Sequence, residues 1–423
     1  MSELLLVEQT EPPGDAQSSG APYILDRNGN MMEGRDDERR TSELRRGLTN
    51  HAKVRTSVSD CPQEELERVL GVLHDRAYLQ ALRAVSSQEP TMMPEWAPPG
   101  LPADSPVWAG VVSTAFEGAR TAISAAHAIL EGERYTYALC RPPGHHAGPA
   151  WLGGYCYLNT AAAAAHVLCL GGLGQVAILD IDFHFPTGTS AMVAPFEDLT
   201  LGSLHASTIA EVPWRMVAAG ERERFVEFAS APDADTYMAA LGEIVDELAR
   251  TANAIVLSLG YDTIASDPHG SWDFPPSIFK RIGARLAASD LPICVVQEGG
   301  YSLDALAECA SAFADGLLDE SPAKSLEPFR RRLDFIDEEI ARLFGDRFEI
   351  CREVAQHKRE NDIPMMQPER VIEVRERYLE RGREANVPLE FTAALFELLI
   401  GASCKLEDEL IAQPLASGDG SVR

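Results

Sequence analysis

The stretch Val176-Ala-Ile-Leu-Asp-Ile-Asp-Phe-His184 restricts the folds open to this chain more than any other segment. An apolar run typical of a buried strand ends in Asp180, Asp182 and His184 at alternate positions. Because side chains on a strand alternate between its two faces, we expect these three to point to the same side. The pattern indicates a metal site at the end of a strand. Taken alone, it also fits the alternative in which the three residues only cap the following helix.

Strand-like and helical segments alternate along the first three quarters of the chain. This alternation predicts an α/β fold in which a parallel sheet carries helices on both faces. The expected strands are residues 135–140, 175–183, 199–204, 254–259 and 292–296, and the expected helices are residues 64–85, 111–131, 161–169, 236–252 and 277–287.

Changes in composition predict the domain organisation. Residues 1–22 are rich in Pro, Gly, Ser and acidic residues and are expected to form a disordered tail, whereas residues 33–46 are expected to be a solvated surface segment. A first domain over 23–317, a linker over 318–325, an all-α domain over 326–411 and a tail over 412–423 follow. Three helices are expected in the all-α domain, at 326–358, 368–384 and 388–411.

Four of the expected strands end in side chains capable of chemistry. In open parallel sheets, ligands bind beyond the carboxyl ends of the strands, so these ends are expected to form one site. The side chains are His145 and His146 after one strand, Asp180, Asp182 and His184 after the next, then Asp262, and Tyr301 after the last.

Two carboxylates and one imidazole, from Asp182, Asp262 and His184, make an open ligand set. Such a set leaves positions for water and substrate, as catalytic zinc sites do, and iron(II) is an alternative metal. The tandem histidines His145 and His146 are candidates for general base and acid. The phenol of Tyr301, after two glycines, is a candidate for stabilising a developing oxyanion. 

The motifs around these residues resemble those of the zinc-dependent deacetylases of the histone deacetylase superfamily. They read C-R-P-P-G-H-H-A (140–147), G-G-Y-C-Y-L-N (153–159), D-x-D-x-H (180–184), S-L-H (203–205), G-Y-D-T with a later D-P (260–268) and E-G-G-Y (298–301). The resemblance spans about residues 23–317 and is greatest to the bacterial acetylpolyamine amidohydrolase branch. It implies an arginase/deacetylase-like α/β fold and hydrolysis of a small-molecule N-acyl amine.

The resemblance implies roles for single residues, position by position. Asp182, His184 and Asp262 would bind zinc, and the second histidine of the pair, His146, would be the main base and acid beside His145. Tyr301 would polarise the amide carbonyl. Asp180 and Ser203 would lie in a structural potassium (K+) site.

One segment departs from the family pattern. Where relatives continue H-H-G-x-G-T, this chain reads His184-Phe-Pro-Thr-Gly-Thr189. The metal ligand His184 is kept, but the neighbouring His-Gly-Asn is replaced by Phe185, Pro186 and Thr187. The change bears on substrate preference and on support around the metal, and a degenerate scaffold without activity is the alternative.

The long helical segment over 326–358 carries an apolar seam at helical spacing. Its members are Leu333, Ile336, Ile340, Leu343, Ile350 and Val354. Arg347 occupies the same seam, and Lys358 lies about three turns further along the same stripe. Burial of two cations is costly unless an anion meets them, so the seam indicates an anion site. The alternative is that Arg347 reaches solvent and Lys358 lies past the packed region.

The pattern R-x6-D-x9-R-x10-K from Arg330, with P-E-R-V at 368–371 and S-x3-E at 403–407, resembles type II chorismate mutases. The resemblance covers about residues 326–411. It implies that three arginines bind the two carboxylates of a chorismate-like dicarboxylate, and that two further side chains approach its ether oxygen. The arginines are Arg330, Arg347 and Arg370, the ether-oxygen pair is Lys358 and Glu407, and Ser403 completes the set.

Two positions qualify the implied substrate. Glu407 stands where many relatives carry Gln, and a carboxyl must be protonated to donate, which predicts loss of activity as pH rises. Val371 stands where some relatives carry a Glu that reads the ring hydroxyl, so isochorismate, 4-amino-4-deoxychorismate and a lyase outcome stay open. Relatives are intertwined homodimers in which the residue at position 330 reaches across the interface, so a homodimer is expected.

Charge and cysteine usage narrow the partners and the compartment. The net charge of -28 disfavours nucleic-acid backbones and anionic membranes as partners. Eight cysteines without a C-x-x-C pair indicate a reducing cytoplasm, and no apolar run approaches transmembrane length. The sequence therefore predicts a cytoplasmic bifunctional enzyme, a zinc amidohydrolase followed by a chorismate mutase-like isomerase. The alternatives are a degenerate deacetylase scaffold with a helical dimerisation or aromatic-metabolite-sensing domain, and isochorismate-pyruvate lyase activity in the second domain.

Overall fold

The computed structural model describes residues 3–10, 21–25, 30–207, 220, 222–319, 327–364 and 366–411, without the side chains of 327–332 and 334. The chain divides into two compact units, Met1–Glu320 and Ser321–Arg423, which we describe separately. Within the described ranges, no helix combines the length and the apolar character needed to cross a lipid bilayer.

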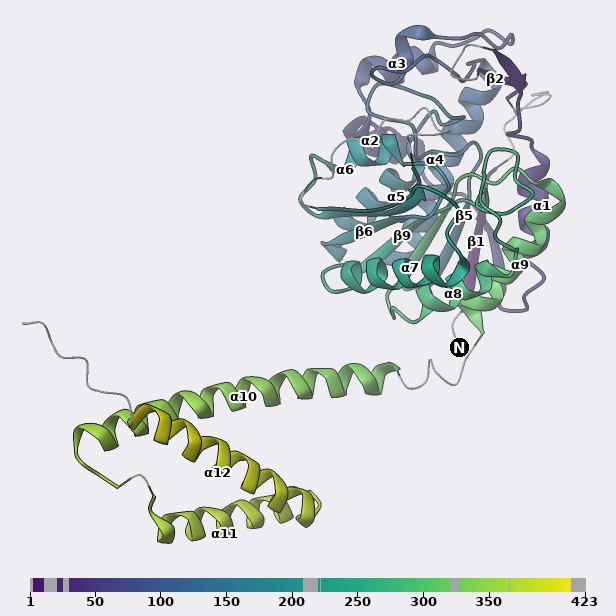
Figure 1. The fold of residues 1–423 in the computed structure, drawn as a ribbon. Coiled ribbons are helices and arrows are strands. Elements are labelled where there is room, and N and C mark those ends of the chain that lie inside the picture. Colours follow the sequence, from purple (N-terminus) through teal and green to yellow (C-terminus); the bar gives the residue numbers. More distant parts are fainter. Residues whose placement is uncertain are drawn as a thin grey trace, which may run out of the picture. The chain divides into compact units, whose positions relative to one another are not determined.

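The first unit is built on an eight-stranded sheet in the order β4-β1-β5-β10-β9-β6-β7-β8, in which every pairing is parallel (Figure 1). The strands are β1 (Leu4–Glu8), β4 (Val54–Val58), β5 (Tyr135–Leu139), β6 (Val176–Asp180), β7 (Leu199–Ala206), β8 (Glu223–Phe228), β9 (Ala254–Leu259) and β10 (Ile293–Gln297). A separate antiparallel ribbon pairs β2 (Tyr23–Leu25) with β3 (Met31–Glu33). The predicted parallel α/β sheet is confirmed.

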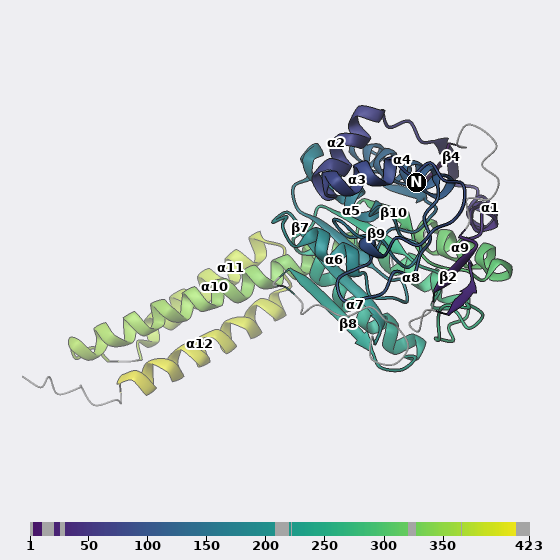
Figure 2. The same cartoon turned by 90° about the horizontal axis from the view of Figure 1, so that it is seen from above.

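Helices cover both faces of this sheet (Figures 1 and 2). They are α1 (Arg39–Leu48), α2 (Gln63–Leu73), α3 (Arg76–Arg83), η1 (Pro94–Trp96), α4 (Ala109–Leu130), α5 (Thr160–Leu168), η2 (Cys169–Leu173), α6 (Thr187–Val193), α7 (Ala234–Ala249), α8 (Ile278–Ala287) and α9 (Leu303–Leu318). The alternation along β6 divides the core: Val176 and Ile178 pack with α2, α4 and α5, whereas Ala177 and Leu179 pack with α1, α7, α8 and α9. A strand buried on both faces reads as a continuous apolar run, which is why this segment is so apolar.

The structure corrects three expectations about the first unit. Residues 4–8 do not belong to a tail, because β1 pairs with β4 and β5 and buries Leu4 and Leu6 completely. Residues 33–46 are not simply a solvated segment, because α1 turns Arg40 and Leu44 into the core. The single helix expected over 64–85 is broken into α2 and α3 at residues 74–75. Residues 11–20 of the expected tail lie outside the described residues.

The second unit consists, in its described part, of three helices, as predicted. They are α10 (Glu327–Glu360), α11 (Pro368–Glu384) and α12 (Leu389–Ile411), and α12 packs on both others (Figure 1). A Cβ at Gly382 would lie 2.5 Å from Cγ2 of Thr392, so a glycine permits the close approach of α11 to α12. The expected linker and C-terminal tail lie largely outside the described residues, so their boundaries stay predictions.

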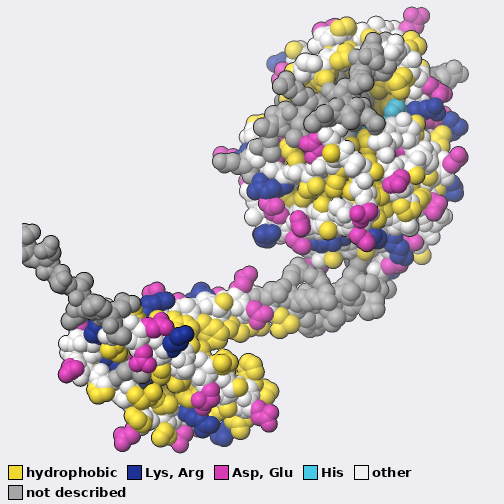
Figure 3. All heavy atoms as spheres, viewed as in Figure 1, with side chains coloured by type: hydrophobic (Ala, Val, Ile, Leu, Met, Phe, Trp, Pro, Cys, Tyr) yellow, Lys and Arg dark blue, Asp and Glu magenta, His cyan; other side chains and the backbone are white. Residues whose placement is uncertain are grey.

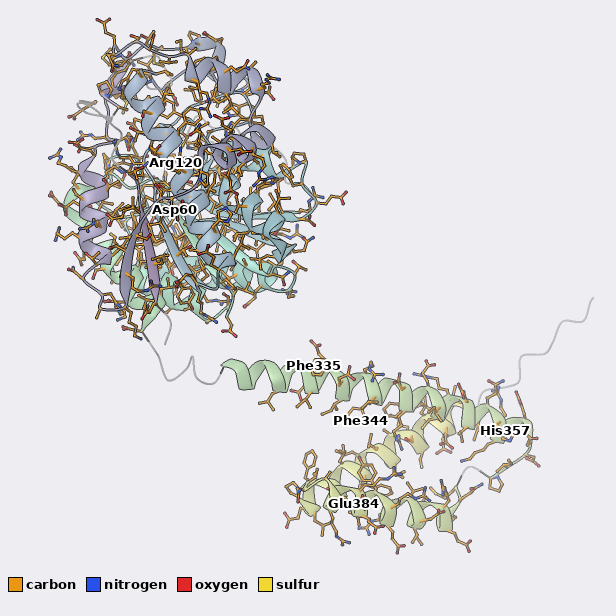
Figure 4. The ribbon with its side chains drawn as sticks, turned by 180° about the vertical axis from the view of Figure 1, so that it is seen from behind. Asp60, Arg120, Phe335, Phe344, His357 and Glu384 are labelled. Atoms are coloured by element: carbon orange, nitrogen blue, oxygen red, sulfur yellow. The ribbon has the colours of Figure 1, made fainter. Side chains whose placement is uncertain are left out.

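The predicted apolar seam of α10 is mostly open to solvent in the single chain. Its six members, Leu333, Ile336, Ile340, Leu343, Ile350 and Val354, are between 39% and 59% exposed. Figure 3 shows the resulting band of apolar side chains on the helical unit, and Figure 4 shows Phe335 projecting from the same helix. An apolar stripe of this extent is unusual on a surface that stays exposed, and it is typical of a surface that another protein covers.

Candidate metal centre and helical cation site

The structure brings Asp182, His184 and Asp262 together at the carboxyl ends of β6 and β9. One ligand atom from each lies within 4.8 Å of the others. Nδ1 of His184 is 3.1 Å from Oδ1 of Asp182 and 3.1 Å from Oδ2 of Asp262. Both carboxylates are buried, but the His184 side chain is 18% exposed, so the cluster is reached from the imidazole side.

The surroundings of this cluster fit a metal ion. The main-chain N–H of Gly299 donates to Oδ2 of Asp182 and that of Phe183 donates to Oδ1 of Asp262, which turns the remaining oxygens toward His184. A Cβ at Gly260 would lie 2.4 Å from the Asp182 carboxylate, so the cradle excludes larger residues. Burial and the charge of Asp182 raise the pKa of Asp262 to about 7, because two buried carboxylates repel unless a cation joins them.

The tandem histidines lie beside these ligands and are fully buried. The centre of the His145 ring is 4.1 Å from that of His146, and the His146 ring is 5.8 Å from that of His184. Nδ1 of His145 is 3.2 Å from the carboxylate of Asp180. Burial opposes charge on His145, but Asp182 and Asp180 outweigh it and raise its pKa to about 10, whereas burial and the neighbouring His145 hold the pKa of His146 well below its usual value. The pair therefore consists of one cationic and one neutral imidazole.

Glu298 fixes the loop that presents the histidines, a contact that sequence reasoning missed. Its Oε2 accepts hydrogen bonds from the main-chain N–H of Gly144, at 2.6 Å, and of His145, at 3.1 Å. Gly154, at a φ of 56°, closes the other side, and a Cβ there would lie 2.3 Å from the His146 ring. The only sequence signal for this acid was its place in the E-G-G-Y motif, three residues before Tyr301.

Tyr301 reaches the same site from the end of β10. Gly300 before it has a φ of 113°, and a Cβ there would lie 2.7 Å from Cβ of Tyr261, so the turn requires glycine. Arg40 of α1 fixes this turn: Nε donates to the carbonyl of Gly300 and Nη2 to that of Glu298, both at 2.6 Å. The sequence signal for Arg40 was its helical spacing from the buried leucines of α1, which its charged neighbours obscured.

The two residues expected in a potassium site are cross-strand neighbours. Asp180 of β6 is in register with Ser203 of β7 on one side and with Ser258 of β9 on the other. Asp180 and Ser203 are completely buried, and the Ser203 hydroxyl is 2.9 Å from Nδ1 of His205. This arrangement is compatible with a cation site, and the potassium itself stays a prediction.

The segment that departs from the family pattern packs an apolar wall behind the ligands. Phe185 is completely buried, with its ring centre 5.0 Å from that of His205 and 5.1 Å from that of Phe225. Pro186 precedes α6, and the Thr187 hydroxyl donates to the carbonyl of Phe185 at 3.4 Å. The replacement therefore buries an aromatic ring directly after the ligand His184.

In the helical unit, α10 and α12 bring four of the six predicted residues together. Nη1 of Arg347 donates to the hydroxyl of Ser403 at 2.6 Å, and Nζ of Lys358 lies 2.7 Å from Oε2 of Glu407. The Lys358 and Glu407 side chains are only 15% and 12% exposed. The structure therefore does not support the alternative in which Arg347 reaches solvent and Lys358 lies past the packed region.

One predicted residue, Arg370, is not joined to this group. Arg370 lies exposed on α11, where Nη1 pairs with Glu373 of the same helix at 2.7 Å. The side chain of Arg330 lies outside the described residues. Of the five predicted residues whose side chains the structure describes, four therefore meet at one place in a single chain.

A parallel sheet with acids and imidazoles converging at its strand ends places the first unit in the class of deacetylase-fold hydrolases. Residues 35–317 match the family model described as histone deacetylase domain, and the chain belongs to this family. Residues 329–408 match the family model described as chorismate mutase type II, which confirms the resemblance predicted from the sequence.

Similar proteins support the same assignment. Acetylpolyamine amidohydrolase 1 of Pseudomonas aeruginosa is 34% identical over 212 residues, which cover 48% of this chain and 61% of that protein. The chain thus spans about three fifths of the length of this relative. The acetylpolyamine amidohydrolase of Burkholderia pseudomallei is 32% identical over 281 residues, covering 58% and 82%. A crystal structure of acetylpolyamine aminohydrolase from Burkholderia pseudomallei is similar with a TM-score of 0.64 and 26% identity, covering 75% of this chain and 98% of that chain.

Proposed function

We propose that the chain is a bifunctional enzyme. Its first unit hydrolyses a small N-acyl amine with the help of zinc, and its helical unit carries out a chorismate mutase-type rearrangement. The observation that carries the hydrolase is the convergence of Asp182, His184 and Asp262 within 4.8 Å beside a buried histidine pair. The names of the relatives, acetylpolyamine amidohydrolases, make an acetylated polyamine the first substrate to test.

The residues around the metal cluster divide the chemistry among them. A divalent cation held by the three ligands supplies a Lewis acid and acidifies water; zinc suits an open set of this kind, with iron(II) as the alternative. His146 is the general base and then the acid, since it is the neutral member of the pair. His145, held by Asp180, keeps a positive charge next to the developing oxyanion. Tyr301 donates a hydrogen bond from its phenolic O–H to the amide oxygen.

The helical unit binds a chorismate-like dicarboxylate. A pericyclic rearrangement needs no nucleophile, so positioning and electrostatic stabilisation suffice. Arg347 and Lys358 offer two partly buried cations, and Ser403 orients the first of them. In the free site Nζ of Lys358 lies 2.7 Å from Oε2 of Glu407, so substrate binding must separate this pair before Glu407 can donate to the ether oxygen.

A homodimer completes this second site in our proposal. The exposed seam of α10 provides an apolar surface for a second copy, and Arg370 does not reach the other described site residues within one chain. Arg330 is then supplied by the partner chain. The free thiols of all eight cysteines are compatible with the reducing cytoplasm expected from the sequence.

Mass spectrometry of small molecules incubated with the purified chain tests both halves. Zinc-loaded wild type is expected to deacetylate N-acetylputrescine and to convert chorismate, isochorismate or 4-amino-4-deoxychorismate. His146→Ala is expected to lose only the first activity and Arg347→Ala only the second. A chain that binds a prephenate-like dicarboxylate without turnover would instead favour the alternative of a sensing domain. Absence of deacetylation with zinc or iron(II) would favour the degenerate scaffold.

A further inference from the structure

We propose that His269 determines the specificity of the hydrolase site. It selects N-acyl amines that carry an acceptor oxygen in addition to the amide carbonyl over N-acyl amines that carry none. The inference deepens the proposed hydrolase function and rests on it. His269 follows Asp262 in the loop after β9, and none of the roles assigned above uses it.

One buried carboxylate clamps His269 to Tyr301. Oδ1 of Asp267 accepts the main-chain N–H of His269 at 2.9 Å, and Oδ2 accepts that of Tyr301 at 2.6 Å. The imidazole consequently stands edge-on to the phenol, with ring centres 4.7 Å apart and an interplanar angle of 81°. A group on His269 is therefore held beside the phenol that we propose acts on the amide.

Tyr155 sets the tautomer of this imidazole. The ring of Tyr155 contacts both His269 and Tyr301, at 5.7 and 5.6 Å between centres. Its hydroxyl oxygen accepts the main-chain N–H of Arg35 at 3.2 Å and lies 3.3 Å from Nε2 of His269. Since Nε2 is the acceptor available to the phenolic proton among the described residues, the imidazole proton lies on Nδ1.

Nδ1–H of His269 is then a donor that remains available to a ligand. Among the described residues it has no hydrogen-bond partner, and the side chain is partly exposed. Burial, with His184, Arg35 and Arg40 acting in the same direction against Asp182, lowers the pKa of His269 to about 4, so the ring is neutral near pH 7. A neutral imidazole locked at Nε2 recognises an acceptor oxygen and not a donor. The nearby arginines favour an anionic acceptor.

A carboxylate or a hydroxyl on the acyl amine could supply the acceptor, and matched substrates distinguish them. Nε-acetyllysine differs from N-acetylcadaverine only by a carboxylate, and N-acetyl-5-aminopentanol ends in a hydroxyl. For the zinc-loaded chain, we expect His269→Leu to lower the kcat/KM ratio of an acceptor-bearing substrate to N-acetylcadaverine about tenfold. The kcat/KM of His269→Leu for N-acetylcadaverine itself should stay within about twofold of the wild-type value. A change with the carboxylate alone, or with the hydroxyl alone, supports the inference and identifies the acceptor.

Two further variants separate recognition from packing. His269→Asn keeps an N–H near the position of Nδ1 and should restore most of the kcat/KM ratio. Tyr155→Phe removes the hydroxyl that fixes the imidazole proton on Nδ1 and should lower the same ratio. A uniform fall in kcat/KM for all three compounds, with the ratio unchanged, would overturn the inference and leave His269 a structural residue.

Calorimetric binding of the same compounds makes the result independent of turnover. If the wild type hydrolyses none of them, the proposed hydrolase function fails, and the inference is judged on the affinity ratio alone. That ratio must again fall about tenfold in His269→Leu. Equal affinities of wild type and His269→Leu for every compound would overturn it.

Discussion

The guanidinium of Arg40 lies 4.5 Å from the centre of the Tyr301 ring, although the two residues are at opposite ends of the first unit's sequence. The same guanidinium donates to Asp36 at 2.6 Å, and this ion pair is almost completely buried. Helix α1 is thereby tied to the turn that presents the phenol of Tyr301. Buried ion pairs stabilise weakly as pairs but are costly to break from one side.

Replacing Arg40 should therefore affect stability and catalysis together. Arg40→Met leaves Asp36 buried without its nearest cation and should lower the free energy of unfolding by about 3–5 kcal/mol. Arg40→Lys keeps the charge but not the three donors, so kcat should fall about 100-fold through misplacement of Tyr301. Urea unfolding and deacetylation kinetics measure the two effects. Arg39→Lys, whose side chain is 68% exposed, is the matched control and should change neither.

Removal of the metal should destabilise the fold of the first unit. One zinc per chain is expected by elemental analysis, and at a zinc concentration about 1,000 times the Kd it should stabilise the fold by about 4 kcal/mol. Asp262→Ala should lose both the zinc and this stabilisation, because only two ligands remain. Asp273→Ala, at an exposed position in the same connection, should keep both. Retention of zinc by Asp262→Ala would disprove the ligand assignment.

Acid should destabilise the first unit through His74. Burial lowers the pKa of His74 to about 4, and its Nε2 accepts the main-chain N–H of Asn159, which requires the neutral ring. The unfolded chain protonates His74 near its usual pKa of about 6.5, so below that pH the unfolded state gains protons first. Stability present above pH 6.5 should thus be lost toward pH 4, by about 3 kcal/mol.

The measurement is the free energy of unfolding at several pH values between 7.5 and 4. His74→Gln, which keeps an acceptor but cannot be protonated, should flatten the pH dependence. His127→Gln, at a partly exposed position on α4, should retain it. An identical slope for His74→Gln and the wild type would mean that other groups dominate.

The pH profile of the mutase reaction should depend on Glu407. A carboxyl donates to an ether oxygen only when it is protonated, and in the free site Nζ of Lys358 lies 2.7 Å from Oε2 of Glu407. Wild-type activity should therefore fall as the pH rises, whereas Glu407→Gln, which donates through an amide, should keep its activity at alkaline pH. Rates from pH 5 to 9 test this, with Glu409→Gln on the exposed face of α12 as the control. Parallel profiles would exclude a role as proton donor.

A charge in the seam of α10 should separate the proposed dimer. Leu343 is 54% exposed in the single chain, so Leu343→Lys should not destabilise the isolated helices but should disrupt an apolar interface. Sedimentation should show monomers, and the mutase activity should disappear while deacetylation persists. Asp337→Lys, at an exposed position outside the seam, should remain dimeric. A monomeric wild type would contradict the proposal at once.

Periodicity in the sequence predicted the structure where residues close together in the chain share one face of a strand or helix. The strand period placed Asp180, Asp182 and His184 on one side, and the helical period predicted the bounds of α11 and placed Arg347 and Lys358 on one stripe of α10. The strand β1 escaped prediction because four apolar residues and one glutamate beside a Pro- and Gly-rich segment give too short a pattern.

Contacts between distant segments could not be predicted from local patterns. Glu298 and Arg40 act through main-chain groups of other loops, and no periodicity in their own segments indicates such partners. The clamp that Asp267 forms on His269 and Tyr301 is of the same kind. The position of Arg370, exposed on its own helix, likewise depends on which chains assemble and not on its spacing.

The strand order β5-β10-β9 has a consequence for how the hydrolase matures on the ribosome. Strand β10, the last of the eight to be synthesised, lies between two partial sheets, β4-β1-β5 and β9-β6-β7-β8. Until it emerges, each partial sheet exposes an unpaired inner edge, which favours chaperone engagement or aggregation. The nascent polypeptide can therefore acquire a working catalytic pocket only in the last moments of translating this unit, when β10 inserts and carries the E-G-G-Y turn into place.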